Sequence, residues 1–142
     1  MSCGSAGNCS AVGFYSDSSG DEQAFVVSQV HGTWGKAEEV PGTAALNTGK
    51  SALVNSVSCG SAGNCSAGGT YTDSSGNAQA FVVSQVHGTW GKAEEVPGTA
   101  ALNTGGYAGI SSVSCTSASN CSAGGYYTES SNAFQVFVVS QT

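Results

Sequence analysis

Six cysteines are the residues whose type and spacing most directly allow chemistry. They form three pairs, each with five residues between its members: Cys3 and Cys9, Cys59 and Cys65, and Cys115 and Cys121. A loop of this length can fold back as a hairpin, which places the paired cysteines opposite each other within disulfide distance. We therefore expect three local disulfides, with reduced thiols or a metal site as alternatives. Three disulfides indicate an oxidising compartment, hence an extracellular, secreted protein, although no signal peptide is visible.

Aromatic side chains are the best candidates for ligand binding, because they combine a large apolar face with a polar group. Two tryptophans lead this group, followed by tyrosines and histidines: Trp34, Trp90, Tyr15, Tyr71, Tyr127, His31 and His87. If a glycan binds, we expect equivalent sites near Trp34 and Trp90. The alternative, which we favour, is that each tryptophan packs between sheets and donates its indole N–H to a turn.

Catalytic residues are not evident. Glu38–Glu39 and Glu94–Glu95 are paired carboxylates, but neighbours along a strand point to opposite faces and cannot flank one glycosidic bond. No G-x-S-x-G nucleophile motif occurs. Every candidate in the first half of the chain recurs 56 residues later, whereas an active site usually needs one asymmetric set of residues. We expect a protein that is not an enzyme and has no cofactor.

Two loops that begin with an aspartate have oxygen-bearing side chains at alternate positions, as calcium loops do. They cover residues 17–21 and 73–77. Neither has the bidentate glutamate that calcium loops carry at the twelfth position. We therefore expect plain hairpin turns there and no metal site.

All these residues recur because the chain repeats every 56 residues. Ser2-Cys3 returns at Ser58 and again at Ser114. The first copy covers residues 2–57, the second covers 58–113, and the third is a half copy of 114–142. Residues 23–49 of the first copy are identical to 79–105 of the second. We treat residues 1–142 as a single repeat domain.

Each copy has the pattern of four short strands, and no segment has helical periodicity. We expect strands at residues 108–114, 64–72, 79–86 and 90–96, with turns at 73–77 and 87–89. Proline and glycine at 97–98 end the fourth strand, and residues 99–106 form a connection. Aromatic and valine residues keep fixed places in each copy, which argues against a disordered chain.

Four short strands per repeat of this length favour a propeller blade. Blades pack face to face, so the small residues at 66–69 would admit the next sheet, and the apolar residues at 81–83 would fill the space opposite. We predict an all-β fold of tandem four-stranded antiparallel blades, a partial β-propeller of about two and a half repeats. A solenoid and a β-sandwich are the alternatives.

Three motifs strengthen this interpretation: S-C-x-S-x-x-N-C-S-A-G-G-x-Y, F-V-V-S-Q and G-T-W-G-K-A-E-E-V-P-G. Over essentially the whole chain they resemble blade repeats of secreted bacterial β-propeller proteins. The resemblance implies the fold and says nothing about a ligand. The copy number departs from the family pattern, because a closed propeller needs at least about four blades.

The composition argues against several partners. Charged residues make up 8% of the chain, and the net charge is −6, with three lysines and no arginine. A nucleic-acid binder needs cations to displace counterions from phosphates, and an anionic membrane attracts basic segments. No apolar stretch approaches the roughly 20 residues of a spanning helix. We expect neither nucleic acid nor membrane as a partner.

The number of strands predicts self-assembly. The first copy begins after the place of its first strand, and the third stops before its fourth, which leaves ten strands and an incomplete blade at each end. Open edges recruit other chains, either into a closed ring such as a six-bladed dimer, which we favour, or into a filament. The expected function is a non-catalytic, self-assembling extracellular protein with a structural or scaffold role. The alternative is a multivalent, lectin-like glycan-binding module.

Overall fold

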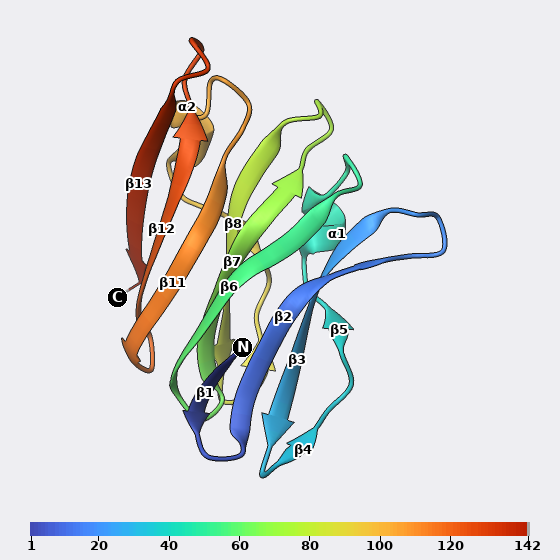
Figure 1. The fold of residues 1–142 in the computed structure, drawn as a ribbon, viewed down its shortest axis with the longest axis vertical. Helices are drawn as coiled ribbons and strands as arrows, with labels where there is room; N and C mark the ends of the chain where they lie inside the picture. Colours follow the sequence, from blue (N-terminus) through green and yellow to red (C-terminus); the bar gives the residue numbers. More distant parts are fainter. Residues whose placement is uncertain (142) are drawn as a thin grey trace.

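Residues 1–141 form three antiparallel β-sheets that stand side by side in chain order (Figure 1). The protein is known from a computed structural model, which describes residues 1–141; Thr142, the last residue of the half copy, lies outside the described residues. Within residues 1–141 the sheets do not close into a ring. The all-β, antiparallel prediction is confirmed, whereas a propeller is not formed by this chain alone.

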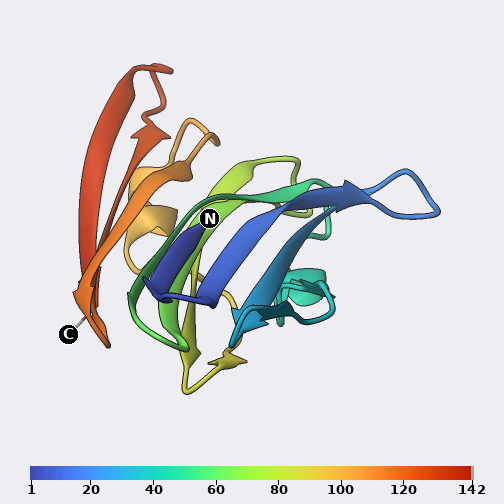
Figure 2. The same ribbon diagram turned by 60° about the horizontal axis from the view of Figure 1, so that its bottom comes forward.

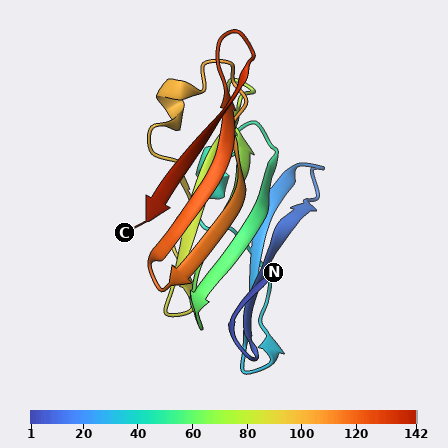
Figure 3. The ribbon, with the colours of Figure 1, turned by 60° about the vertical axis from the view of Figure 1, so that its left-hand side comes forward.

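The first sheet contains β1 (Ser2–Ser5), β2 (Asn8–Ser16), β3 (Glu22–Val30), β4 (Thr33–Trp34) and β5 (Glu38–Glu39). The second contains β6 (Ala52–Ser61), β7 (Asn64–Thr72), β8 (Ala78–Val86), β9 (Thr89–Trp90) and β10 (Glu94–Glu95). The third contains β11 (Gly109–Ser117), β12 (Asn120–Thr128) and β13 (Phe134–Gln141). Figure 2 shows the sheets in a curved row, and Figure 3 shows them overlapping face to face.

The fourth strand of each complete sheet is interrupted, which corrects the prediction of one strand over residues 90–96. In the second sheet β9 and β10 both pair with β8. Between them the Gly91 N–H donates to Ser84 O (2.8 Å), but the Ala93 N–H donates to Pro41 O (2.7 Å) in the segment after β5. The first sheet has the same break, since β4 and β5 both pair with β3, so the bond to the neighbouring repeat accompanies the break in the second sheet and is not its cause.

The first strand of each sheet extends further than predicted. β11 ends at Ser117 and β6 at Ser61, so the first cysteine of each pair lies inside the strand. Pairing continues to Ser61 and Asn64 because the chain reverses only at the two residues between them. The first sheet also has the short strand β1, so the expectation that the first copy supplies only strands two to four is wrong.

Two single-turn helices begin the predicted connections. They are α1 (Thr43–Leu46) and α2 (Thr99–Leu102), too short to leave a helical pattern in the sequence. Among residues 1–141, no helix is long and apolar enough to cross a membrane.

A buried asparagine after each helix ties two sheets together. Asn47 Nδ2 donates to Glu22 O at 3.1 Å, at the start of β3. Its Oδ1 accepts hydrogen bonds from Ser51 N (2.8 Å) and from Thr72 N at the end of β7 (3.4 Å). Asn103 makes the corresponding bonds between the second and third sheets. A buried amide with both ends satisfied fixes the spacing of the sheets at this point.

The hydrophobic core lies between sheets. Val26 of β3 shares one cluster with Phe81 of β8, and both are fully buried. Ala80, on the other face of β8, shares a second cluster with Ile110 of β11. We call the face that packs on the preceding sheet the leading face and the face that packs on the following sheet the trailing face. The second sheet is covered on both.

The first strands also meet directly, since β6 lies between β2 and β11 (Figure 1). Ser2 Oγ accepts a hydrogen bond from Cys59 N, and Ser58 Oγ accepts one from Cys115 N, both at 3.0 Å. At Gly60 a Cβ atom would lie 2.2 Å from the backbone of the next sheet. Glycine is therefore required for this approach.

Small residues in β7 admit the next sheet, as predicted. A Cβ atom on Gly68 would lie 2.8 Å from Ile110 Cγ2. We call the contact between two neighbouring sheets a junction. In the first junction, between the first and second sheets, the corresponding residues are Val12 and Val54, and Val12 packs against the cluster that contains Val54. The larger isoleucine therefore faces glycine, and the smaller valine faces valine.

A double-mutant cycle tests this complementary packing. Gly68→Val should lower the free energy of unfolding by about 1–3 kcal/mol, because the new side chain overpacks Ile110. Ile110→Val alone should cost about 0.5–1.5 kcal/mol. The double variant recreates the first junction, so urea unfolding should show a loss smaller than the sum of the two single losses. Strict additivity would contradict direct contact between these positions.

Candidate functional site

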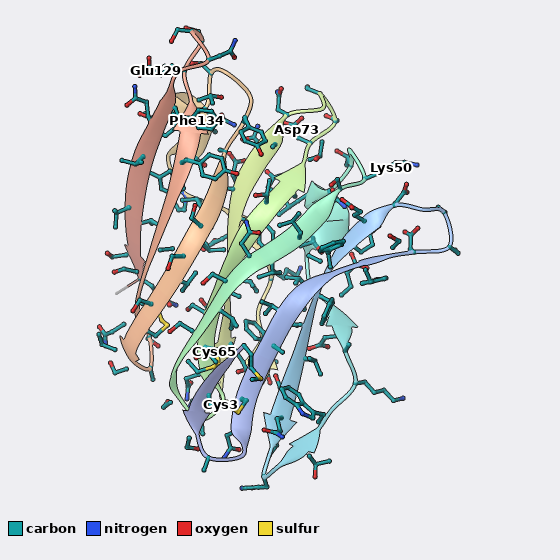
Figure 4. All side chains as sticks on the ribbon, viewed as in Figure 1. Cys3, Lys50, Cys65, Asp73, Glu129 and Phe134 are labelled. Carbon is teal, nitrogen blue, oxygen red and sulfur yellow. A yellow bond between two sulfur atoms is a disulfide. The ribbon has the colours of Figure 1, made fainter. Side chains whose placement is uncertain are left out.

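The six cysteines form three disulfides, as predicted. Each bond joins the two members of one C-x5-C pair, and the paired Cα atoms lie 3.9 to 4.0 Å apart. Figure 4 shows Cys3 and Cys65 near one end of the sheets, opposite the end that carries Asp73 and Glu129. Within residues 1–141, no group of three His, Cys, Asp or Glu side chains is arranged to hold a metal ion.

Each disulfide hairpin is braced by the asparagine that precedes its second cysteine. Asn8 Nδ2 donates to Ser5 Oγ (3.0 Å), and Asn8 Oδ1 accepts a hydrogen bond from His31 N (3.3 Å). Asn64 and His87 repeat the second contact at 3.2 Å. Both histidines are exposed turn residues with φ near +50°. The asparagine holds this unfavourable backbone conformation in place.

The two tryptophans occupy different environments despite identical local sequences. Trp90 is 6% exposed, and its Nε1 donates to Ser28 Oγ of the first sheet at 3.3 Å. Trp34 is 44% exposed, and no residue from 1 to 141 accepts a hydrogen bond from its Nε1. The expected packing role holds for Trp90, although its N–H reaches the neighbouring sheet rather than a turn. The two residues therefore do not form equivalent exposed sites.

The candidate tyrosines differ in the same way. Tyr71 is 4% exposed, packs with its ring centroid 6.4 Å from that of Phe81, and donates from its hydroxyl to Glu95 Oε2 (3.2 Å). Burial, together with the Glu95 charge, raises the pKa of Tyr71 above its ordinary value. Tyr15, its counterpart in the first sheet, is 40% exposed. Tyr127 is partly buried against the core between the second and third sheets.

The paired glutamates face opposite sides of the sheet, as expected. Glu95 lies opposite Phe81 and accepts the hydrogen bond from Tyr71, whereas Glu94 lies opposite Val82. The two carboxylates of a pair therefore cannot act on one bond between them.

In the first sheet, the region around β5 forms an open pocket of about 320 Å³ on the leading side. Its lining residues are Tyr15, Phe25, Ala37, Glu38 and Glu39.

The aspartate loops are hairpin turns. Asp17 Oδ1 accepts hydrogen bonds from Ser19 N (2.8 Å) and Asp21 N (3.0 Å), and Oδ2 accepts one from Gln23 Nε2 (3.0 Å). The hydrogen bond from Gln23 is the main cause that holds the pKa of Asp17 below its ordinary value. Asp73 makes the same set of contacts. The carboxylate in each loop thus accepts hydrogen bonds that shape the turn.

A cluster of three aromatic rings in the third sheet was missed by the sequence reasoning. Tyr107, Tyr126 and Phe134 have ring centroids 5.5 to 6.1 Å apart, at the end of the sheets where Figure 4 labels Phe134. Tyr107 and Phe134 are exposed, whereas burial, followed by the hydrogen bond with Tyr107, raises the pKa of Tyr126 to about 12. The available signal was departure from the repeat: Tyr107 stands where the first copy has Ser51, and Phe134 stands where the second has Ala78.

The predicted candidates are thus spread over the molecule. The disulfides and histidines lie at one end of the sheets, and the tryptophans lie beside the leading faces of two different sheets.

No protein-family model matches the chain, and no curated protein matches it.

The different burial of the tryptophans leads to a stability prediction. Trp90→Ala should lower the free energy of unfolding by about 3–5 kcal/mol, as for a large buried aromatic residue. Trp34→Ala should cost clearly less, about 1 kcal/mol, because that ring is half exposed. Chemical denaturation of dilute, non-reduced protein measures both, since dilution limits any contribution from association. Equal losses would contradict the difference in burial.

Proposed function

We propose that this chain is a non-catalytic, self-assembling extracellular repeat protein with a structural role, whose sheets act as blades of a partial β-propeller. The observation that carries the proposal is that the same apolar positions are buried between sheets and exposed at both ends of the row. A repeat module needs neighbours to cover its faces, and such faces recruit further modules.

The trailing face of the third sheet is one exposed end. Val138 is 77% exposed, whereas Val26, at the same position in the first sheet, is fully buried under the second sheet. Phe134 and Val136 of the same strand are also exposed. A row of exposed apolar side chains on one sheet face is unfavourable in water and marks an interaction surface.

The leading face of the first sheet is the other exposed end. Tyr15 and Trp34 are exposed there, and their counterparts Tyr71 and Trp90 are buried against the first sheet. The side chains are of the same type in both sheets, and they differ in whether a preceding sheet covers them.

The outer edge of β13 is also unprotected at this end of the row. Within residues 1–141, β13 pairs only with β12, so its other edge has free backbone N–H and C=O groups. The strand contains no charged residue and no proline, which are the usual means of protecting such an edge.

The extracellular part of the proposal rests on the three disulfides, which persist in oxidising compartments. The non-catalytic part rests on the repetition of the polar candidates between the first and second copies. Face-to-face addition that closes on itself gives a ring, and addition that does not close gives a filament.

Self-assembly is tested by measuring mass in solution. Light scattering or native mass spectrometry at micromolar concentration should give multiples of the 14.0 kDa chain mass. Electron micrographs of the same sample should show rings or filaments. A compact monomer at 14.0 kDa over the whole concentration range would reject the proposal.

A second candidate function, glycan binding, is favoured by the aromatic cluster of Tyr107, Tyr126 and Phe134. Its exposed rings provide faces on which a sugar can stack, and residues 1–141 contain one such cluster. This candidate therefore places one site in the third sheet rather than one per repeat.

If glycans bind, a glycan array should identify ligands whose affinity depends on this cluster. Phe134→Ala or Tyr107→Ala should weaken binding about threefold to tenfold through lost stacking. Phe14→Ala, at another exposed aromatic residue, is the matched control and should bind as the unmodified chain does. The absence of any array signal, or equal weakening by the control, would reject this function.

A further inference from the structure

We propose that chains associate head to tail, with the trailing face of the third sheet of one molecule packed on the leading face of the first sheet of another. The contact would reproduce the central part of the two junctions within the chain. This inference rests on the proposed self-assembly and specifies which faces meet and which residues pair.

Both internal junctions contain the same hydrogen bond between a glutamine and a serine. Gln85 Nε2, on the leading face of the second sheet, donates to Ser28 Oγ on the trailing face of the first at 2.9 Å. Gln141 Nε2 donates to Ser84 Oγ at the next junction at 3.1 Å. In the first junction the indole N–H of Trp90 donates to the same Ser28 oxygen. This Gln–Ser pair marks the register in which one sheet sits on the next.

The leading face of the first sheet already has the donor half of this pair. Gln29 Nε2 donates to Gly32 O at 3.1 Å, just as Gln85 Nε2 donates to Gly88 O at 3.2 Å. An amide nitrogen has two N–H groups, and the second one of Gln85 reaches Ser28. The side chain of Gln29 is therefore held in the conformation that makes the contact, with its second N–H available. Little side-chain entropy is lost when a partner arrives.

The apolar surroundings of Gln29 are also those of an internal junction. Residues 23–49 are identical to residues 79–105, so β3 and β4 present the same leading-face side chains as β8 and β9. Val83 of β8 is buried in the first junction, and Val27 is its counterpart in β3. A surface that covers the trailing face of one sheet within the chain fits the same kind of face on another molecule.

The trailing face of the third sheet has the acceptor half. Ser140 occupies the position of Ser28 and Ser84, and its hydroxyl lies 3.0 Å from that of Ser122. The corresponding pair in the second sheet, Ser84 and Ser66, has the same contact at 3.4 Å. The acceptor is thus oriented by its own sheet before a second molecule binds.

The valine beside this serine is also retained, because Val138 corresponds to Val26 and Val82. Two residues further along this face differ: Val136 stands where the other sheets have the buried residues Ala24 and Ala80, and Phe134 stands where they have Glu22 and Ala78. These larger side chains require more space at that end, so we expect the closest contact around Val138 and Ser140. Residues 134–141 carry no charge, so association buries none from this strand.

Another molecule of the same chain is the favoured occupant of each exposed face, because the proposed interface continues one that the chain already contains twice. Donors lie on leading faces and acceptors on trailing faces, so neither face is complementary to itself. Two-fold pairing of like faces would leave the donors without these acceptors, whereas head-to-tail contact joins them.

The test uses two variants, each blocking one face with a lysine. Val138→Lys blocks the trailing face, and Trp34→Lys blocks the leading face. Each variant alone should elute as a 14.0 kDa monomer, and an equimolar mixture should give a heterodimer of twice that mass, because one unmodified face of each kind remains. Val86→Lys is the control: this valine is 48% exposed although both faces of its sheet are covered, and the variant should assemble as the unmodified chain does.

A milder variant keeps the test informative if a lysine variant fails to fold. Circular dichroism and disulfide mapping show whether each variant is folded. Gln29→Glu keeps the size of the side chain and removes its N–H donors. It should raise the apparent dissociation constant of the assembly at least about tenfold, since Ser140 loses its donor and a buried charge is introduced. An unchanged dissociation constant for folded Gln29→Glu protein would overturn the assigned register.

The outcomes separate this inference from self-assembly itself. If the unmodified chain assembles but only one of the two lysine variants dissociates, like faces pair and the head-to-tail arrangement is wrong, while self-assembly stands. If both variants are monomeric and their mixture forms no heterodimer, the head-to-tail arrangement is also wrong. If the unmodified chain is itself a monomer, both proposals fail.

Discussion

Burial of each sheet face by a neighbouring sheet is the constraint on which the rest of this structure depends. Phe81 and Ala80 are adjacent in β8, point to opposite faces, and are both fully buried. A single sheet with apolar residues on both faces has no core of its own, so its stability comes from the two junctions beside it. The same constraint explains why the sheets at the ends of the row expose valine and aromatic side chains.

Polar contacts give these junctions their register. Apolar burial is not directional and would tolerate sliding of one sheet over another. Asn47 and Gln85 are buried, and their hydrogen bonds to the adjacent sheet are satisfied only when the sheets are correctly aligned. The disulfides act more locally, because each closes a short hairpin and removes little entropy from the unfolded chain.

Identical sequence segments therefore have different roles according to their place in the row. Trp90 is a core residue and Trp34 is a surface residue, although the segments around them match. Repetition alone predicts equal sites, whereas the structure separates covered copies from exposed ones. The features unique to the chain lie where the repeat is broken, as at Tyr107 and Phe134.

Sequence alone was sufficient for the features that depend on neighbours close in the chain. The 56-residue period is visible directly in the sequence. The three disulfide pairings, the bounds of β7 and the aspartate turn at Asp73 follow from local spacing, because the residues that interact lie close together in the chain. Only the tertiary structure determined the bond from Ala93 to Pro41, the bonds of Asn47 and the burial of Trp90. Each of these depends on a group from another sheet or repeat, such as Pro41 or Ser28, and strand periodicity carries no information about such partners.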